Sequence, residues 1–215
     1  MLVIHHRRNL VDELKQTPCT NGIEIDIRNH GADLFVVHDP FRTDAVLFSQ
    51  WIKNYNHKFL IVNVKEEGLE PKVCEILAEN NVNDFFILDE SFPFIRKYAM
   101  QGLSNFAVRI SEFESIETAI NLANYLRAQR ERIDWLWVDC FSGHPWHVEH
   151  ASFLLDAGFK LCLVSPELHY VNYAECENLV FQYQEKLCNC QGVAARPDMV
   201  CTKFVDLWEE YAAKV

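Results

Sequence analysis

The feature that most constrains the fold is the alternation of short apolar runs with amphipathic helical stretches. Eight runs with β-type composition follow one another: Leu2–Ile4, Ile23–Ile27, Phe59–Val64, Asp84–Leu88, Phe106–Ile110, Trp135–Val138, Lys160–Val164 and Met199–Thr202. Helical stretches lie between most of them, at Val73–Glu79, Pro93–Met100, Ile116–Arg127, His147–Ala157, Glu175–Leu187 and Val205–Ala213. Because strands that alternate with helices pair in parallel, the pattern predicts an α/β fold with a parallel sheet.

Eight strands are the number that closes a (β/α)₈ TIM barrel, and 215 residues lie near the short end of that fold's usual range. We therefore predict a compact TIM barrel that occupies residues 1–215 as a single domain. The alternative is an open doubly wound sheet. It is disfavoured because no glycine-rich turn follows any of the strands.

One further apolar run, Leu34–Val37, follows Ile27 too closely to leave room for a helix. We expect a small hairpin after the second strand, with its turn at residues 29–31 and a returning strand behind it. Such a hairpin would carry His38 and Asp39 to the carboxyl-terminal rim of the barrel, where the functional residues of this fold lie.

The charge balance narrows the classes of partner. Lys and Arg total 20 against 31 Asp and Glu, a net charge of −11, which argues against nucleic acid and against stable docking on anionic membranes. No uncharged apolar run is long enough to span a membrane, and the first residues do not form a secretory signal, so we expect a cytoplasmic protein. The eight cysteines are then expected to be thiols. Cys188 and Cys190 match no common zinc-site spacing.

Glu24 and Asp26 are the most informative pair of polar residues. They alternate with Ile23, Ile25 and Ile27, so both carboxylates would point to the same side of a strand. If that side is the barrel interior, two buried negative charges require compensation, and Mg²⁺ or Ca²⁺ is suited to oxygen ligands. The alternative is a strand edge on which both acids face solvent.

The other strand ends supply histidines and cations. His6 follows the first strand and His38 follows the hairpin, and two imidazoles at one rim can act as general acid and general base. Arg7 and Lys65 are positioned to offer positive charge to an anionic substrate. The fifth predicted strand ends near Arg109.

In their order along the chain, these residues resemble the motif series of the glycerophosphodiester phosphodiesterase family, which belongs with the phosphatidylinositol-specific phospholipase C barrels. His6-Arg7, Glu24-x-Asp26 and His38-Asp39 are similar to its His-Arg-Gly, Glu-x-Asp and His-Asp motifs, at nearly the same spacing. The clear similarity ends after the third predicted strand. Beyond it the agreement is mainly architectural.

The resemblance implies a divalent metal ion, Mg²⁺ or Ca²⁺, with Glu24 and Asp26 as ligands. The family's third ligand is a glutamate two residues before the lysine of the third strand, and this chain has Asn63 there. An amide oxygen binds a hard cation without contributing charge. Glu67 and Asp139, which follow the third and sixth strands, are the alternative third ligands.

The resemblance also implies a catalytic arrangement. His6 and His38 correspond to the acid and the base, and Lys65 is the third catalytic residue. Arg7, Lys65 and Arg109 are expected to bind the phosphate group of a small phosphodiester.

Two functional hypotheses stand after this comparison. The first is a metal-dependent phosphodiesterase whose nucleophile is either water or a hydroxyl of the substrate itself. The second is a non-catalytic or drifted relative that binds a phosphorylated ligand, which the asparagine at the third ligand position favours. A hydrolase of the His-x-His type fits poorly, because adjacent histidines point to opposite faces of a strand.

Overall fold

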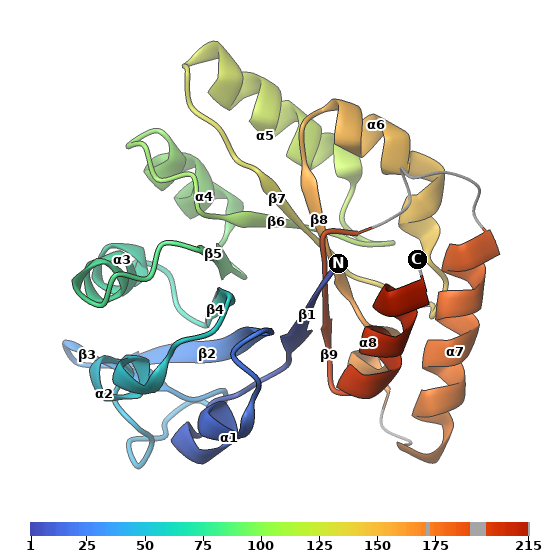
Figure 1. The fold of residues 1–215 in the computed structure, drawn as a ribbon. Helices are drawn as coiled ribbons and strands as arrows, with labels where there is room; N and C mark the ends of the chain where they lie inside the picture. Colours follow the sequence, from blue (N-terminus) through green and yellow to red (C-terminus); the bar gives the residue numbers. More distant parts are fainter. Residues whose placement is uncertain (171–172, 190–196, 215) are drawn as a thin grey trace. The chain divides into compact units, whose positions relative to one another are not determined.

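The protein is described by a computed structural model that covers residues 1–170, 173–189 and 197–214 (Figure 1). It divides into two compact units. The N-terminal unit is His5–Phe106, and the C-terminal unit contains Met1–Ile4 and Ala107–Val215. The single domain expected from the sequence stays a prediction.

The N-terminal unit is built on three parallel strands in the order β5-β4-β2. These are β2 (Gly22–His30), β4 (Phe59–Val64) and β5 (Phe85–Leu88), and β3 (Asp33–Val36) pairs antiparallel with β2. The helices are α1 (Val11–Gln16), α2 (Phe48–Trp51) with a following 3₁₀ turn (Ile52–Asn54), α3 (Glu70–Glu79) and α4 (Phe92–Ala99).

All six residues of β4 are buried, as expected for a parallel strand covered on both faces. The pairing of β2 with β4 sets Ile25 beside Val62 and Asp26 beside Asn63. Because neighbouring residues in register point to the same face of a sheet, Asp26 and Asn63 share a face with Glu24, two residues earlier on β2. This register assembles the first three polar groups of the candidate site.

The hairpin after β2 is present, but its turn lies later than predicted. β2 continues to His30, which pairs with Asp33, so Gly31 and Ala32 form a two-residue connection. Gly31 has a φ of +60°, which glycine adopts without a Cβ penalty. The turn was misplaced because Asn29 and His30 have turn-like composition yet continue the strand ladder.

The C-terminal unit contains β1 (Leu2–His5, whose last residue belongs to the other unit), β6 (Ala107–Ile110), β7 (Trp135–Val138), β8 (Lys160–Val164) and β9 (Met199–Thr202), in the order β1-β9-β8-β7-β6. The pairs from β6 to β9 are parallel. Its α-helices are α5 (Ile116–Ala128), α6 (Ala151–Asp156), α7 (Tyr173–Asn189) and α8 (Val205–Lys214). Two 3₁₀ helices, Trp146–His150 and Pro166–His169, complete the unit.

Each of the eight predicted strands is present, and β4, β7, β8 and β9 have the predicted bounds. The predicted helix His147–Ala157 is divided into the 3₁₀ helix Trp146–His150 and α6. The helices α1 and α2 were not predicted, because six and four residues are too short to show a helical period. Cys188 is an exposed thiol near the end of α7, and Cys190 lies outside the described residues. Among the described residues, no helix is long and apolar enough to cross a membrane.

Candidate active site

The candidate site is a buried carboxylate pair in the N-terminal unit. Glu24 and Asp26 each expose only 1% of their surface, and Asn63 on the neighbouring strand exposes 8%. The alternative of a solvent-facing strand edge is therefore wrong for this pair. Burial removes the hydration of both carboxylates, so the surrounding groups decide whether each one can hold a negative charge.

Asp26 has two cationic partners. The Lys65 ammonium Nζ lies 3.1 Å from Asp26 Oδ1, and Arg7 Nε lies 3.3 Å from Asp26 Oδ2. Lys65 is also 3.5 Å from Asp89 Oδ2, at the end of β5. The structure thus brings the predicted cations Arg7 and Lys65 onto the predicted carboxylate pair.

Glu24 has less compensation. Its Oε2 accepts a hydrogen bond of 2.7 Å from the Arg7 backbone N–H, and His6 Nε2 lies 3.9 Å from the same oxygen. Burial, and next the charge of Asp26, raise the pKa of Glu24 from 4.5 to about 8. Near neutral pH, the Glu24 carboxyl therefore holds a proton unless a bound cation replaces that proton.

Asn9 fixes the orientation of Asp26. Its Nδ2 donates to Asp26 Oδ2 at 2.9 Å, while the Asp26 backbone N–H donates to Asn9 Oδ1 at 3.0 Å. We did not predict Asn9 as a site residue. The available signal was its position directly after His6, Arg7 and Arg8 at the end of β1.

The second histidine is oriented by the residue that follows it. Nδ1 of His38 is 2.9 Å from Oδ1 of Asp39, and this hydrogen bond is the main reason that the pKa of Asp39 lies below its ordinary value. Arg28 Nε donates to the His38 carbonyl at 2.7 Å, and the Arg28 guanidinium also pairs with Glu66. The segment after the hairpin is therefore attached to β2 through Arg28.

Unusual backbone conformations support the choice of site. In the part of the chain that the structure describes, five non-glycine residues have positive φ. Asn81 and Arg130 directly follow the C-caps of α3 and α5, where this conformation is common. The other three are Arg7, Phe41 and Asp89, with φ of 54°, 63° and 65°. All three belong to the N-terminal unit, and backbone strain of this kind gathers at functional sites.

The remaining predicted residues lie elsewhere. Glu67 is exposed, and its charge acts on Glu90, whereas the charges that act on Glu24 are those of Asp26, Lys65 and Arg7. The structure therefore does not bring Glu67 to the carboxylate pair.

Arg109 and Asp139 form a cluster in the C-terminal unit. Arg109 Nη1 lies 3.2 Å from Asp139 Oδ2, and His169 Nε2 contacts the other carboxylate oxygen, which also accepts the Cys140 backbone N–H at 3.0 Å. The oxygens of Asp139 are thus occupied by donors of its own unit. His169 was not predicted, because it lies in a 3₁₀ helix rather than directly after a strand.

Glu70 and Glu90 form a second acidic pair in the N-terminal unit. Glu70 is fully buried at the start of α3, and Glu90 is half-buried just after β5. Burial, followed by a hydrogen bond to Glu70, raises the pKa of Glu90 from 4.5 to about 9. Glu90 therefore holds a proton at neutral pH.

Because the folded pKa is raised, the contribution of Glu90 to stability is complete below pH 4.5 and is lost as the pH rises towards 9. The free energy of unfolding of the wild type should fall between pH 5 and 9 by about 1–2 kcal/mol more than that of Glu90→Gln, a value reduced for solvent screening. Urea unfolding between pH 5 and 9 measures it, with the exposed Glu75→Gln on α3 as control. A wild-type profile parallel to that of Glu90→Gln would contradict the raised pKa of Glu90.

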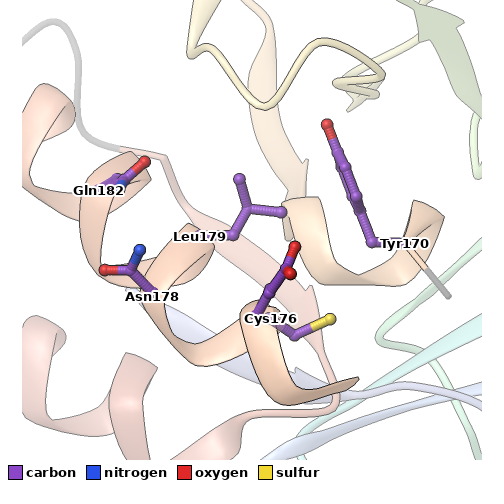
Figure 2. A pocket seen from close by; sticks show the side chains of 6 residues that line it. Tyr170, Cys176, Asn178, Leu179 and Gln182 are labelled. Carbon is purple, nitrogen blue, oxygen red and sulfur yellow. The ribbon is translucent and has the colours of Figure 1, made fainter. Parts of the chain in front are cut away.

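A cavity of about 250 Å³ in the C-terminal unit lies between α7 and the 3₁₀ helix Pro166–His169 (Figure 2). Its lining consists of Tyr170, Glu175, Cys176, Asn178, Leu179 and Gln182. None of these was predicted as a site residue.

Comparisons with known proteins give the fold. No protein-family model matches the chain, and no curated protein matches its sequence. A putative glycerophosphoryl diester phosphodiesterase from Agrobacterium tumefaciens is similar with a TM-score of 0.68 at 9% identity, over 99% of this chain and 97% of that one. A glycerophosphoryl diester phosphodiesterase from Parabacteroides distasonis gives 0.67 at 12% identity, over 99% and 86%.

A second structure from Agrobacterium tumefaciens, a glycerophosphodiester phosphodiesterase, gives a TM-score of 0.62 at 13% identity, over 97% of this chain and 99% of that one. The likeness extends over almost the whole length of both chains, which confirms the predicted (β/α)₈ barrel. The chain therefore has the fold of these three glycerophosphodiester phosphodiesterases.

Proposed function

We propose that the protein is a metal-dependent phosphodiesterase that cleaves a small, glycerophosphodiester-like substrate by histidine acid–base catalysis. The observation that carries the proposal is the buried pair Glu24 and Asp26, in which Asp26 contacts Arg7 and Lys65 whereas Glu24 has only His6 and a backbone N–H beside it. Burial of two neighbouring carboxylates destabilises the folded state, and a bound cation would offset this cost. The three phosphodiesterases of the same fold support this reading.

The residues present fit a hard divalent cation, Mg²⁺ or Ca²⁺. Glu24 lacks a full positive partner, and Oδ1 of the buried Asn63 has no hydrogen-bond partner among the described residues. Together with Asp26 they offer oxygen ligands on one face of the sheet. When bound, the cation would neutralise charge on the phosphoryl oxygens.

The histidines would move the protons. One of His6 and His38 takes a proton from the attacking oxygen as the new P–O bond forms, and the other donates a proton to the alcohol oxygen as its P–O bond breaks. Asp39 holds Nδ1 of His38, which leaves Nε2 available for this transfer. Arg7 and Lys65 would hold the phosphate.

The attacking oxygen belongs either to water or to a hydroxyl of the substrate. In the first case the product is a phosphomonoester, and in the second it is a cyclic phosphodiester. The same base serves both routes. ³¹P nuclear magnetic resonance of the products distinguishes them.

Asn63 favours one alternative, a relative that binds a phosphorylated ligand without cleaving it. The neutral amide weakens the charge available to hold a metal. His6 and His38 argue against this alternative, because a binding protein has no need of both an acid and a base. The charge of −11 favours a substrate that is free in water over one held in an anionic membrane.

The test is hydrolysis of bis(4-nitrophenyl) phosphate and of glycerophosphodiesters with Mg²⁺, Ca²⁺ or Mn²⁺ and with EDTA. We expect turnover that requires a metal and disappears with EDTA. A folded protein that binds inorganic phosphate and turns over none of these diesters would instead support the binding relative.

A further inference from the structure

Phe41 occupies a turn position that suits glycine. The turn follows the His38–Asp39 pair, with Pro40 at the first central position and Phe41, at a φ of +63°, at the second. Proline favours the backbone conformation of the first central position, whereas the positive φ at the second central position favours glycine. A phenylalanine there strains the backbone.

The phenyl ring makes no compensating contribution to folding. Its relative exposure is 101%, so the side chain is not packed against the described chain. Single exposed apolar residues are ordinary in folded proteins, and exposure alone would mean little. A fully exposed ring at a position with positive φ is a different case, because glycine at this position would make the fold more stable. The ring's role therefore lies outside the fold.

The turn is held on both sides of Phe41. Before it, the His38 carbonyl accepts the 2.7 Å hydrogen bond from Arg28 Nε. After it, Arg42 makes two hydrogen bonds with the carboxylate of Asp44, from Nε at 2.6 Å and from Nη2 at 2.8 Å. A held turn presents its side chain with little loss of conformational freedom when a ligand binds.

The position of the turn relates the ring to the proposed chemistry. Phe41 follows His38 by three residues, and the positive charges of both Arg42 and Arg7 contribute to lowering the pKa of Asp39. The Val37 backbone N–H, directly before His38, donates to the Asp26 carbonyl at 2.9 Å, so the turn begins three residues after a contact with the strand that carries the carboxylate pair. An apolar group of a diester bound at the carboxylate pair would extend towards this turn.

We propose that Phe41 is a specificity-determining residue that contacts an alkyl or aryl group on one alcohol of the phosphodiester. This inference rests on the proposed phosphodiesterase function and deepens it by naming the substrate class. The ligand is an individual diester molecule rather than a membrane, because Asp39 and Asp44 flank the ring and the protein is acidic overall. Burial of the apolar group against the ring supplies the preference.

Two diesters with the same leaving group test it: methyl 4-nitrophenyl phosphate and hexyl 4-nitrophenyl phosphate. We expect the wild type to prefer the hexyl diester, and Phe41→Gly to lower the hexyl-to-methyl ratio of kcat/KM by about fivefold. Phe181→Ser, at an exposed phenylalanine of α7, is the matched control and keeps the wild-type ratio. The thermal midpoint of Phe41→Gly should equal or exceed that of the wild type.

A wild-type ratio in folded Phe41→Gly would overturn the inference and leave the proposed function standing. A difference between the variants that arises only with phosphatidylcholine–phosphatidylserine vesicles would overturn it in favour of a membrane contact. If the wild type cleaves neither diester, the proposed function fails. Calorimetry with hexyl phosphate and methyl phosphate then decides the inference: a hexyl preference lost in Phe41→Gly supports it, and equal affinities overturn it.

Discussion

Glu24→Gln is expected to lower kcat/KM for phosphodiesters by about 100-fold or more while leaving the fold intact. The amide oxygen can still accept the Arg7 backbone N–H, but it contributes no charge to a bound cation. Because burial raises the pKa of Glu24 to about 8, the wild-type carboxyl is mostly neutral near pH 7 in metal-free protein. In metal-free protein near pH 7, the neutral glutamine side chain therefore closely resembles the protonated carboxyl that it replaces.

The stability of the same variant carries a distinct signature. Because the folded pKa of Glu24 is raised, its contribution to the free energy of unfolding is complete below pH 4.5 and is lost as the pH rises through 8. In the absence of metal, Glu24→Gln should therefore become more stable relative to the wild type as the pH rises across this range. Metal should raise the thermal midpoint of the wild type and leave that of the variant nearly unchanged. Glu75→Gln, at an exposed glutamate of α3, provides the control. Wild-type activity and an unaltered response to metal in Glu24→Gln would exclude Glu24 as a ligand.

His6→Ala and His38→Ala are each expected to lower kcat/KM for a glycerophosphodiester by about 100- to 10,000-fold. Their roles separate when the leaving group changes. An alkoxide needs a proton as it departs, whereas 4-nitrophenolate is stable without one. The variant that lacks the general acid should therefore recover much of its activity on bis(4-nitrophenyl) phosphate, and the variant that lacks the base should not.

His57→Ala is the matched control, because this histidine hydrogen-bonds the Thr17 carbonyl at 3.0 Å and was not predicted to act in catalysis. Circular dichroism establishes that each variant is folded. Equal losses on both substrates for both histidines would contradict the division into acid and base. Unchanged activity in either variant would remove that histidine from the mechanism.

The local sequence pattern was sufficient to predict the strands that carry the candidate site. Glu24 and Asp26 alternate with isoleucines, and this alternation alone implied that they share a face. The strand ends likewise pointed to Arg7 and Lys65, both of which pair with Asp26. The positions of these residues were predictable because strand periodicity and the placement of polar residues at strand ends are local properties. Their roles as metal ligands and phosphate-binding residues stay predictions.

Contacts between distant segments were less predictable. Asn9 holds Asp26 across 17 positions of sequence, and Asp89 meets Lys65 from the next strand. Asp89 has no local signal that distinguishes it from an ordinary loop residue, and the signal for Asn9 was only its position at the end of β1. Glu67 shows the reverse case, because its place after a strand suggested a ligand, yet its charge acts on Glu90.

The sequence by itself determined the alternation of strands and helices, the hairpin after β2 and the identity of the carboxylate pair, since each follows from side-chain period and chain connectivity. Only the tertiary structure decided that Glu24 is the carboxylate left without a full counter-charge, and that a strained backbone exposes Phe41. Both depend on which groups lie near in space. Burial, the distance to each charge and the backbone φ arise only when segments from several strands pack together.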